Sequence, residues 1–396
     1  MRAVDVLVVG GGPAGCVAAW EAAAAGAHGV LLIERDRAIG APVRCAEGVG
    51  GAGLREFLDP DGAPWVSRRI VRVILVAPDD TEVRLAESDV GYILDRTRFE
   101  PALAERASAA GAAIRIGTEA VAMARSNGAG APWHVTLRGP GGEETVAARV
   151  VIGADGVETM VGRWAGLETR VAARDMESCA QYVMGNIAFD PDAIYLHFGP
   201  SVAPGGYAWV FPKGEGIANV GIGVVTLRSD GRTVRRYLDD YVAHRFPGGT
   251  ATGLTVGGVI SGVTVRRTVT DGVILAGDAA HMINPLSGGG IINAMKAGRL
   301  AGRHAARALA EGNVTAPNLQ PYHDEWMRLL GDAHLKYYKI KETVNRYDDD
   351  FFNRLAREVN HIPHGKRTLG RVMASALVHH PSLLPVAAQL FLQEFC

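Results

Sequence analysis

Residues 4–36 of the chain read VDVLVVGGGPAGCVAAWEAAAAGAHGVLLIERD, and this stretch decides the fold. The run Val4–Val9 is almost entirely aliphatic and β-branched, which is typical of a strand buried on both faces of a parallel sheet. Three glycines end the run. Pro13 then stands where a helix can begin, and alanines continue to Gly26, a natural helix C-cap. A second apolar run, Val30–Ile33, follows, so the stretch predicts strand, helix and second parallel strand.

The turn between the first strand and the helix has the spacing G-x-G-x-x-G, at Gly10, Gly12 and Gly15. In dinucleotide-binding folds the first glycine allows a tight turn, the second admits a pyrophosphate and the third lets the helix pack on the strand. The helix N-terminus supplies N–H donors to the phosphates. Glu34 comes directly after the second strand and about 20 residues past the glycines. At this position an acid accepts hydrogen bonds from ribose hydroxyls. An acid at this position favours FAD or NAD over NADP.

Composition describes a globular protein and excludes several classes. The chain has 396 residues, of which 48% are hydrophobic and 21% charged, so it can hold two or three domains. The chain has 41 Lys and Arg residues against 42 Asp and Glu residues, so it has no net positive charge that would attract nucleic acid. The sequence has no apolar run long enough for a membrane span, and its four cysteines lack metal-ligand spacing. We expect no signal peptide. We therefore expect a cytoplasmic protein without a metal site.

The order of strand and helix patterns predicts a three-part organisation. We expect an α/β fold in which a Rossmann-type dinucleotide domain is formed by residues 1–170 and 266–312. Strand-like segments dominate residues 171–265, which predicts an inserted antiparallel sheet that carries the substrate, joined by part of 68–95. Residues 313–396 are mainly helical in pattern.

A second glycine-rich turn lies near the end of the predicted dinucleotide domain. Residues 275–298 read LAGDAAHMINPLSGGGIINAMKAG, in which a short strand ends at Gly277, Asp278 follows in a tight turn and a glycine cluster opens a helix. This resembles the second FAD fingerprint of the flavoprotein hydroxylase superfamily, in which the aspartate accepts from a ribityl hydroxyl. The positive end of the following helix can stabilise negative charge on reduced flavin. The segment VVIGADG resembles the superfamily's Asp-Gly motif, at Asp155 and Gly156.

Two further segments narrow the resemblance. PVRCAEGVG, residues 42–50, resembles the Cys-(Ala/Gly)-Glu-Gly loop of geranylgeranyl reductases, and PGGYAWVFPK, residues 204–213, matches their P-x-x-Y-x-W-x-F-P signature. The resemblance covers about residues 1–310 and implies FAD as the cofactor. The FAD-binding residues that the motifs and the resemblance together imply are Gly10, Gly12, Ala14, Gly15, Glu34, Arg35, Arg44, Cys45, Ala46, Gly48, Arg96, Val121, Asp155, Asp278, Gly288, Gly290 and Ile291.

Three aromatic residues alternate in the second of these segments. Tyr207, Trp209 and Phe211 would all point to one face of a strand. Such a stripe is often ordinary core. Beside two FAD motifs it predicts a wall of an apolar substrate cavity, because an isoprenoid chain offers only shape and apolar contact for recognition.

Cys45 is the candidate catalytic residue. The resemblance places its loop against the flavin ring, and a thiol beside a cation such as Arg44 has a tunable pKa. Cys45 could give or relay a proton, control the loop through its redox state, or only pack against the flavin.

These features predict an FAD-dependent reductase that saturates carbon–carbon double bonds of geranylgeranyl chains in an ether lipid. The alternatives are a monooxygenase that hydroxylates an aromatic substrate, a menaquinone-chain reductase, and an FAD-binding electron carrier. NADPH, ferredoxin or another reduced carrier are all compatible electron donors. The apolar stretch Val372–Phe395 predicts peripheral membrane attachment, and core packing explains it equally well.

Overall fold

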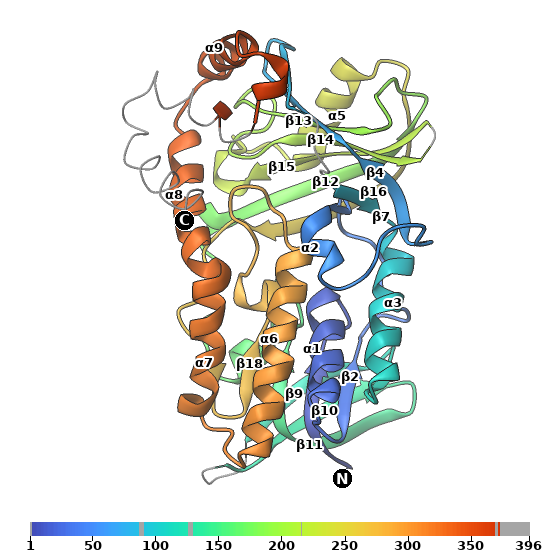
Figure 1. Ribbon diagram of the computed structural model, residues 1–396, viewed down its shortest axis with the longest axis vertical. Helices are drawn as coiled ribbons and strands as arrows, with labels where there is room; N and C mark the ends of the chain where they lie inside the picture. Colours follow the sequence, from blue (N-terminus) through green and yellow to red (C-terminus); the bar gives the residue numbers. More distant parts are fainter. Residues whose placement is uncertain (1, 87–90, 126–129, 215, 369–370, 373–396) are drawn as a thin grey trace. The chain divides into compact units, whose positions relative to one another are not determined.

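The computed structural model describes residues 2–86, 91–125, 130–214, 216–368 and 371–372 (Figure 1). The chain divides into two compact units. The first unit comprises Met1–Val43, Arg96–Val171 and Gly262–His334. The second unit comprises Arg44–Asp95, Ala172–Ser261 and Leu335–Cys396.

The first unit is built on a mainly parallel sheet, whose central segments Val6–Val9, Val30–Ile33 and Val150–Gly153 are buried and apolar. The strands run parallel in the order β18–β11–β1–β2–β8, and β17 pairs antiparallel with β18 at the edge. Strands β9 and β10 extend from β11 as an antiparallel meander. The strands are β1 (Arg2–Val9), β2 (Val30–Ile33), β8 (Ala113–Arg115), β9 (Glu119–Arg125), β10 (Trp133–Gly139), β11 (Gly142–Gly153), β17 (Val269–Thr270) and β18 (Val273–Leu275).

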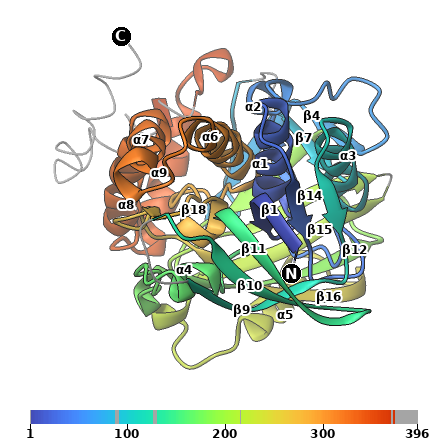
Figure 2. The same cartoon turned by 90° about the horizontal axis from the view of Figure 1, so that it is seen from below.

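Helices cover one side of this sheet, and in Figure 2 α7, α6, α1 and α3 lie in a row along it. Two glycines of α6 allow a close crossing with α1, since a Cβ on Gly298 would lie 2.2 Å from the carbonyl oxygen of Ala14 and one on Gly302 2.5 Å from that of Ala18. The helices are α1 (Pro13–Ala24), α3 (Arg96–Ala109), α4 (Val161–Trp164), the 3₁₀ turn η3 (Gly277–Ala280), α6 (Ile291–Ala310), α7 (Ala316–Trp326) and the π-helical turn η4 (Met327–Gly331).

The second unit contains a seven-stranded sheet in the order β16–β12–β15–β14–β13–β5–β6, and a small sheet in the order β3–β7–β4. Every pair in the large sheet is antiparallel except β13 with β5. The strands are β3 (Gly48–Gly50), β4 (Val66–Ile70), β5 (Arg72–Val76), β6 (Glu82–Arg84), β7 (Gly91–Leu94), β12 (Met176–Gly185), β13 (Ala193–His197), β14 (Ala208–Gly214), β15 (Ile217–Val225) and β16 (Thr250–Ile260).

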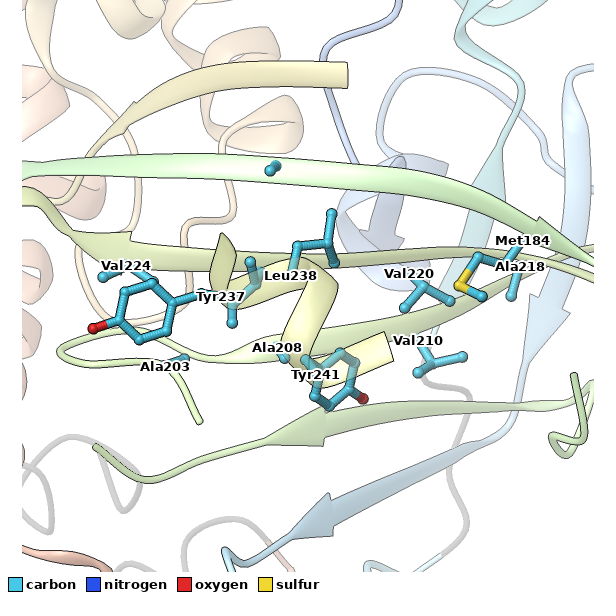
Figure 3. Close-up of a cluster of buried hydrophobic side chains, with 12 residues drawn as sticks. Met184, Ala203, Ala208, Val210, Ala218, Val220, Val224, Tyr237, Leu238 and Tyr241 are labelled. Carbon is cyan, nitrogen blue, oxygen red and sulfur yellow. The ribbon is translucent and has the colours of Figure 1, made fainter. Parts of the chain in front are cut away.

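The two faces of this large sheet differ in what covers them. On one face Leu238 and Tyr241 of α5 (Val234–Arg245) pack on the apolar side chains of the central strands (Figure 3). Helix α5 begins at Thr233, whose hydroxyl accepts from the N–H of Arg236, an N-cap that the sequence pattern did not suggest. Because side chains alternate along a strand, residues next to the α5-facing ones project from the opposite face. We call that opposite side the Trp209 face, since Trp209 alternates with the α5-facing Ala208 and Val210.

The remaining helices of the chain follow the first unit's last segment. Helix α8 (Asp332–Val344) continues into the second unit, where α9 (Asp349–Asn360) packs its apolar side against β5 and β6. The other short helical segments of the second unit are α2 (Gly51–Arg55), η1 (Ala173–Asp175), η2 (Thr226–Arg228) and η5 (His364–Lys366). None of the helices in the described ranges has the length and apolar character to span a bilayer. The predicted membrane-attachment stretch lies outside the described residues apart from its first residue, Val372.

Candidate active site

The three glycines of the G-x-G-x-x-G turn after β1 meet different steric demands. Gly10 has a φ of +106°, and a Cβ on Gly15 would lie 1.8 Å from the carbonyl oxygen of Gly10, so α1 starts in direct contact with the end of β1. Gly12, the N-cap of α1, has extended backbone angles (φ −73°, ψ −175°) and nothing within 4 Å of a Cβ placed on it. The first turn of α1 has no side-chain cap. Open space beside uncapped N–H groups fits a pyrophosphate.

Glu34 is fixed by the same turn. Its Oε2 accepts from the backbone N–H of Gly11 at 2.6 Å and its Oε1 from that of Asp36 at 2.8 Å. Each carboxylate oxygen keeps a second lone pair, so the group can also accept from ribose hydroxyls. Arg35 lies next to it and forms a loose, half-exposed ion pair with Glu158 at 3.9 Å.

The second glycine-rich turn places a carboxylate at the start of α6. Asp278 lies in η3, and its Oδ1 is 3.7 Å from a Cβ built on Gly290, the N-cap of α6. Within the described ranges no hydrogen bond reaches this carboxylate. Burial raises the pKa of Asp278, while the nearby Arg96 lowers it. Gly288 stands in the exposed loop before the helix and Ile291 opens the helix. A hydroxyl group of a ligand would satisfy the Asp278 carboxylate.

The other cofactor residues predicted in the first unit have structural partners of their own. Arg96 begins α3 and donates to Oε1 of Glu100 through its Nε at 2.6 Å. Asp155 caps α4, because its carboxylate accepts from the Thr159 hydroxyl and from the N–H groups at the start of that helix. Val121 lies at an irregularity in the β9–β10 pairing, where the register shifts.

In the second unit the Cys45 loop is held against the Trp209 face by amide side chains. Nε2 of Gln181 donates to the carbonyl oxygen of Cys45 at 3.2 Å, and Nδ2 of Asn219 donates to that of Ala46 at 3.2 Å. Glu47 is 2% exposed, accepts from Asn219 at 3.0 Å and forms an ion pair with Lys213. Two strands, β12 and β15, thus fix the loop's backbone, and β14 fixes its carboxylate.

The Cys45 side chain has one polar contact that bears on its chemistry. The backbone N–H of Glu47 donates to the Sγ atom of Cys45 at 3.1 Å. A donor directed at sulfur stabilises the thiolate that remains after a proton has left. The neighbouring Arg44 is exposed, and its charge is the cation nearest in sequence to the thiol.

The three aromatic side chains share one face, as the alternation predicts, and the Cys45 loop lies on that same face. Trp209 pairs in register with Gly221, and a Cβ on that glycine would lie 2.3 Å from the indole, so the ring rests on the glycine backbone. Ring centroids of Tyr207 and Trp209 are 6.0 Å apart, and those of Trp209 and Phe211 are 6.5 Å apart. The indole N–H of Trp209 donates to Oε1 of Gln181 at 3.0 Å. One glutamine therefore connects the aromatic stripe to the Cys45 loop.

The predicted site residues fall into two groups. The first unit brings together both glycine-rich turns with Glu34, Arg96 and Asp278. The second unit brings together Arg44, Cys45, Ala46, Gly48 and the three aromatic residues. Gly48 touches the stripe directly, since a Cβ on it would lie 2.8 Å from the Phe211 ring.

Comparison with known proteins identifies the family. The family model described as "FAD dependent oxidoreductase" matches residues 5–200, and the one described as "Geranylgeranyl reductase catalytic domain" matches residues 175–260. The digeranylgeranylglycerophospholipid reductase of Methanocella arvoryzae is 41% identical over 384 residues, which cover 96% of this chain and 97% of that protein. The chain belongs to the geranylgeranyl reductase family.

A solved structure agrees with membership of the geranylgeranyl reductase family. The geranylgeranyl bacteriochlorophyll reductase-like protein of Thermoplasma acidophilum superimposes with a TM-score of 0.90 at 33% identity, covering 98% of this chain and 100% of that one. The predicted fold class, enzyme class and FAD dependence are confirmed. The anhydrotetracycline hydroxylase of Streptomyces rimosus matches with a TM-score of 0.65 at 20% identity, over 95% of this chain and 76% of that one. At that identity only the fold is shared with a hydroxylase.

Three residues that fix the cysteine loop of this geranylgeranyl reductase were not singled out by sequence reasoning: Gln181, Asn219 and Lys213. The signal available was an amide residue inside an apolar strand, in Ala-Gln-Tyr of β12 and in Ala-Asn-Val of β15. Buried polar side chains require partners, so such positions mark contacts that the strand pattern alone does not explain.

Proposed function

We propose that this geranylgeranyl reductase saturates the carbon–carbon double bonds of the geranylgeranyl chains of digeranylgeranylglycerophospholipid. The relatives that match over nearly their full length carry that substrate in their names. The observation that carries the proposal is the Trp209 face, where an aromatic stripe and the Cys45 thiol share one side of a sheet. An apolar wall suits a substrate that has no polar group along its chain.

We propose that FAD is held by the first unit through Gly12, Glu34 and Asp278. The open space at Gly12 suits the pyrophosphate, the fixed carboxylate of Glu34 the ribose, and the unsatisfied carboxylate of Asp278 a ribityl hydroxyl. The N-terminus of α6, uncapped at Gly290, stabilises negative charge near it. When bound and reduced, FAD supplies the hydride for the alkene.

A saturated bond also needs a proton, and we propose that Cys45 provides it. The S–H bond breaks, the proton goes to the alkene carbon that does not receive the hydride, and the electron pair stays on sulfur. The N–H of Glu47, already directed at Sγ, stabilises the thiolate that results. Gln181 and Asn219 hold the loop so that the thiol keeps one position during this step.

Trp209 serves in this proposal as part of the substrate wall and as a support of the cysteine loop. Trp209→Ala should lower turnover on geranylgeranyl chains about tenfold or more, because it removes apolar contact and leaves Oε1 of Gln181 without its donor. The turnover of Trp209→Phe, which keeps an aromatic ring but loses the N–H, should fall between those of the wild type and Trp209→Ala. Flavin content and turnover are measured on the same samples. Parallel loss of both would show that Trp209 is only core.

The function is tested anaerobically with dithionite-reduced protein and the geranylgeranyl lipid. We expect lipid products heavier by steps of two hydrogens. Oxygen incorporation with substrate-dependent NADPH oxidation would instead show a hydroxylase.

The reaction also needs an electron donor and access of the protein to its lipid substrate. We propose a low-potential reduced carrier or NADPH as donor, and peripheral contact of the protein with the membrane that contains its lipid. Liposome co-sedimentation of the full chain and of a chain that lacks residues 388–396 tests the contact, and equal binding would exclude the C-terminal segment as anchor.

A further inference from the structure

An acid lies on the Trp209 face beyond the residues used so far. Glu177, Cys179 and Gln181 alternate along β12 and therefore project from the same face. Cys179 pairs in register with Gly223, which has no side chain to separate the groups around it. A Cβ on Gly223 would lie 3.3 Å from Oε2 of Glu177, 3.3 Å from Sγ of Cys179 and 3.9 Å from Cζ3 of Trp209. A carboxyl, a thiol and the indole thus meet over one glycine.

A buried cation stands behind this acid. The Ser261 hydroxyl, which lies near the Glu177 carboxyl, donates to the carbonyl oxygen of Asp175 at 3.4 Å. Lys341 of α8, 4% exposed, donates to the carbonyl oxygen of Ser261 at 2.7 Å and to its hydroxyl at 3.2 Å. The ammonium also lies 3.6 Å from Asp175 and over the ring of Tyr338, whose hydroxyl donates to Asp175 at 2.8 Å.

Opposing effects act on the pKa of Glu177. Burial raises the pKa of Glu177, whereas the Ser261 hydrogen bond and the charge of Lys341 lower it. Cys179 and Tyr207, which face the same space, have their pKa values raised by burial and stay protonated at neutral pH. Each of the two lies within electrostatic range of both Glu177 and Cys45. Gln181, the next residue of β12 on this face, donates to the carbonyl oxygen of Cys45, so Glu177, Cys179 and the Cys45 loop follow one another along this face.

We propose that Glu177 is the proton store that reloads Cys45 after each saturation step. This inference rests on the proposed function, since it assigns the source of the proton that Cys45 gives away. After a turnover Cys45 is a thiolate. The O–H bond of Glu177 breaks, and its proton reaches Sγ through the groups around Cys179 and Tyr207 or a water among them. The carboxylate that remains is stabilised by Ser261 and Lys341, and water reprotonates it before the next cycle. Glu177 acts through Cys45 and not on the substrate.

The test separates the first turnover from later ones. Reduced enzyme is mixed anaerobically with excess geranylgeranyl lipid and dithionite, and saturated bonds are counted against time. In Glu177→Gln the first bond per enzyme should form at the wild-type rate, because Cys45 itself supplies the first proton, and later bonds about tenfold or more slowly. The wild-type steady rate should fall as pH rises through the raised pKa of Glu177. The variant should lack that fall.

The controls keep the outcomes distinct. Glu105→Gln, an exposed change on α3, should behave as wild type. Glu177→Asp retains an acid and should recover the pH dependence with part of the steady rate, which also covers the case in which Glu177→Gln does not fold. A Glu177→Gln protein with wild-type steady rate and pH profile would overturn the inference, and so would an equal slowing of its first and later turnovers. Failure of the wild type to saturate any bond would instead overturn the proposed function.

Discussion

Replacing Cys45 by alanine should slow anaerobic saturation of geranylgeranyl chains by about 100-fold or more, the scale of a lost general acid. The reason is local. The thiol is the proton donor proposed for the alkene, and the N–H of Glu47 is already in place to stabilise the sulfur anion. Stopped-flow reoxidation of reduced flavin by the lipid measures the effect on the first turnover, before reprotonation of Cys45 can limit the rate.

The backbone of the loop should survive this change, because Gln181 and Asn219 bind carbonyl oxygens and not the Cys45 side chain. Cys45→Ala and Cys45→Ser should therefore keep a normal flavin spectrum and accept electrons from dithionite. The serine variant retains a hydroxyl that is a much weaker acid, so it should stay close to the alanine variant. Saturation at the wild-type rate by either variant would remove the chemical role from Cys45.

Replacing Gly12 by alanine should weaken FAD binding strongly while the chain stays folded. The backbone angles at Gly12 suit alanine, and the added Cβ would meet no protein atom within 4 Å. It would enter only the space assigned to the pyrophosphate. We expect the dissociation constant for FAD to rise about 100-fold, or ~2.7 kcal/mol, with the thermal midpoint of the cofactor-free protein unchanged.

Two other glycines serve as controls for that change. Gly141→Ala lies in an open turn with nothing near its Cβ and should leave FAD affinity unaltered. Gly15→Ala forces a Cβ to within 1.8 Å of a carbonyl oxygen and should lower the stability of the cofactor-free protein as well. Titration with FAD and with FMN distinguishes the cofactor, since FMN lacks the pyrophosphate. Unchanged FAD affinity in Gly12→Ala would contradict the assignment of this turn.

The sequence predicted the structure best where residues close together in the chain determine the local geometry. The glycines of the first turn, the buried run of β1 and the acid Glu34 are close in sequence, so their spacing predicts the strand–helix–strand unit and its ligand. The stripe Tyr207, Trp209 and Phe211 was predictable for the same reason, because alternation fixes the face within one strand.

Contacts that depend on strand register were beyond the sequence pattern. Gln181 meets Cys45 across 136 residues and Asn219 meets Glu47 across 172. Which side chains of β12 and β15 stand opposite Gly48 and Phe211 follows from the pairing of separate strands, and neither strand determines it alone. Helix α5 was missed because its mixed Arg, Tyr and Asp pattern lies between strand-like segments. The parallel β13–β5 pair joins segments more than a hundred residues apart.

The central claim is that the bound, reduced flavin and Cys45 together add two hydrogens to an isoprenoid double bond. The most direct measurement is mass spectrometry of digeranylgeranylglycerophospholipid after anaerobic incubation with dithionite-reduced protein. Wild type should yield products heavier by successive steps of two hydrogens, and Gly12→Ala without flavin should yield none. An unchanged lipid with fully reduced wild-type flavin would contradict the account.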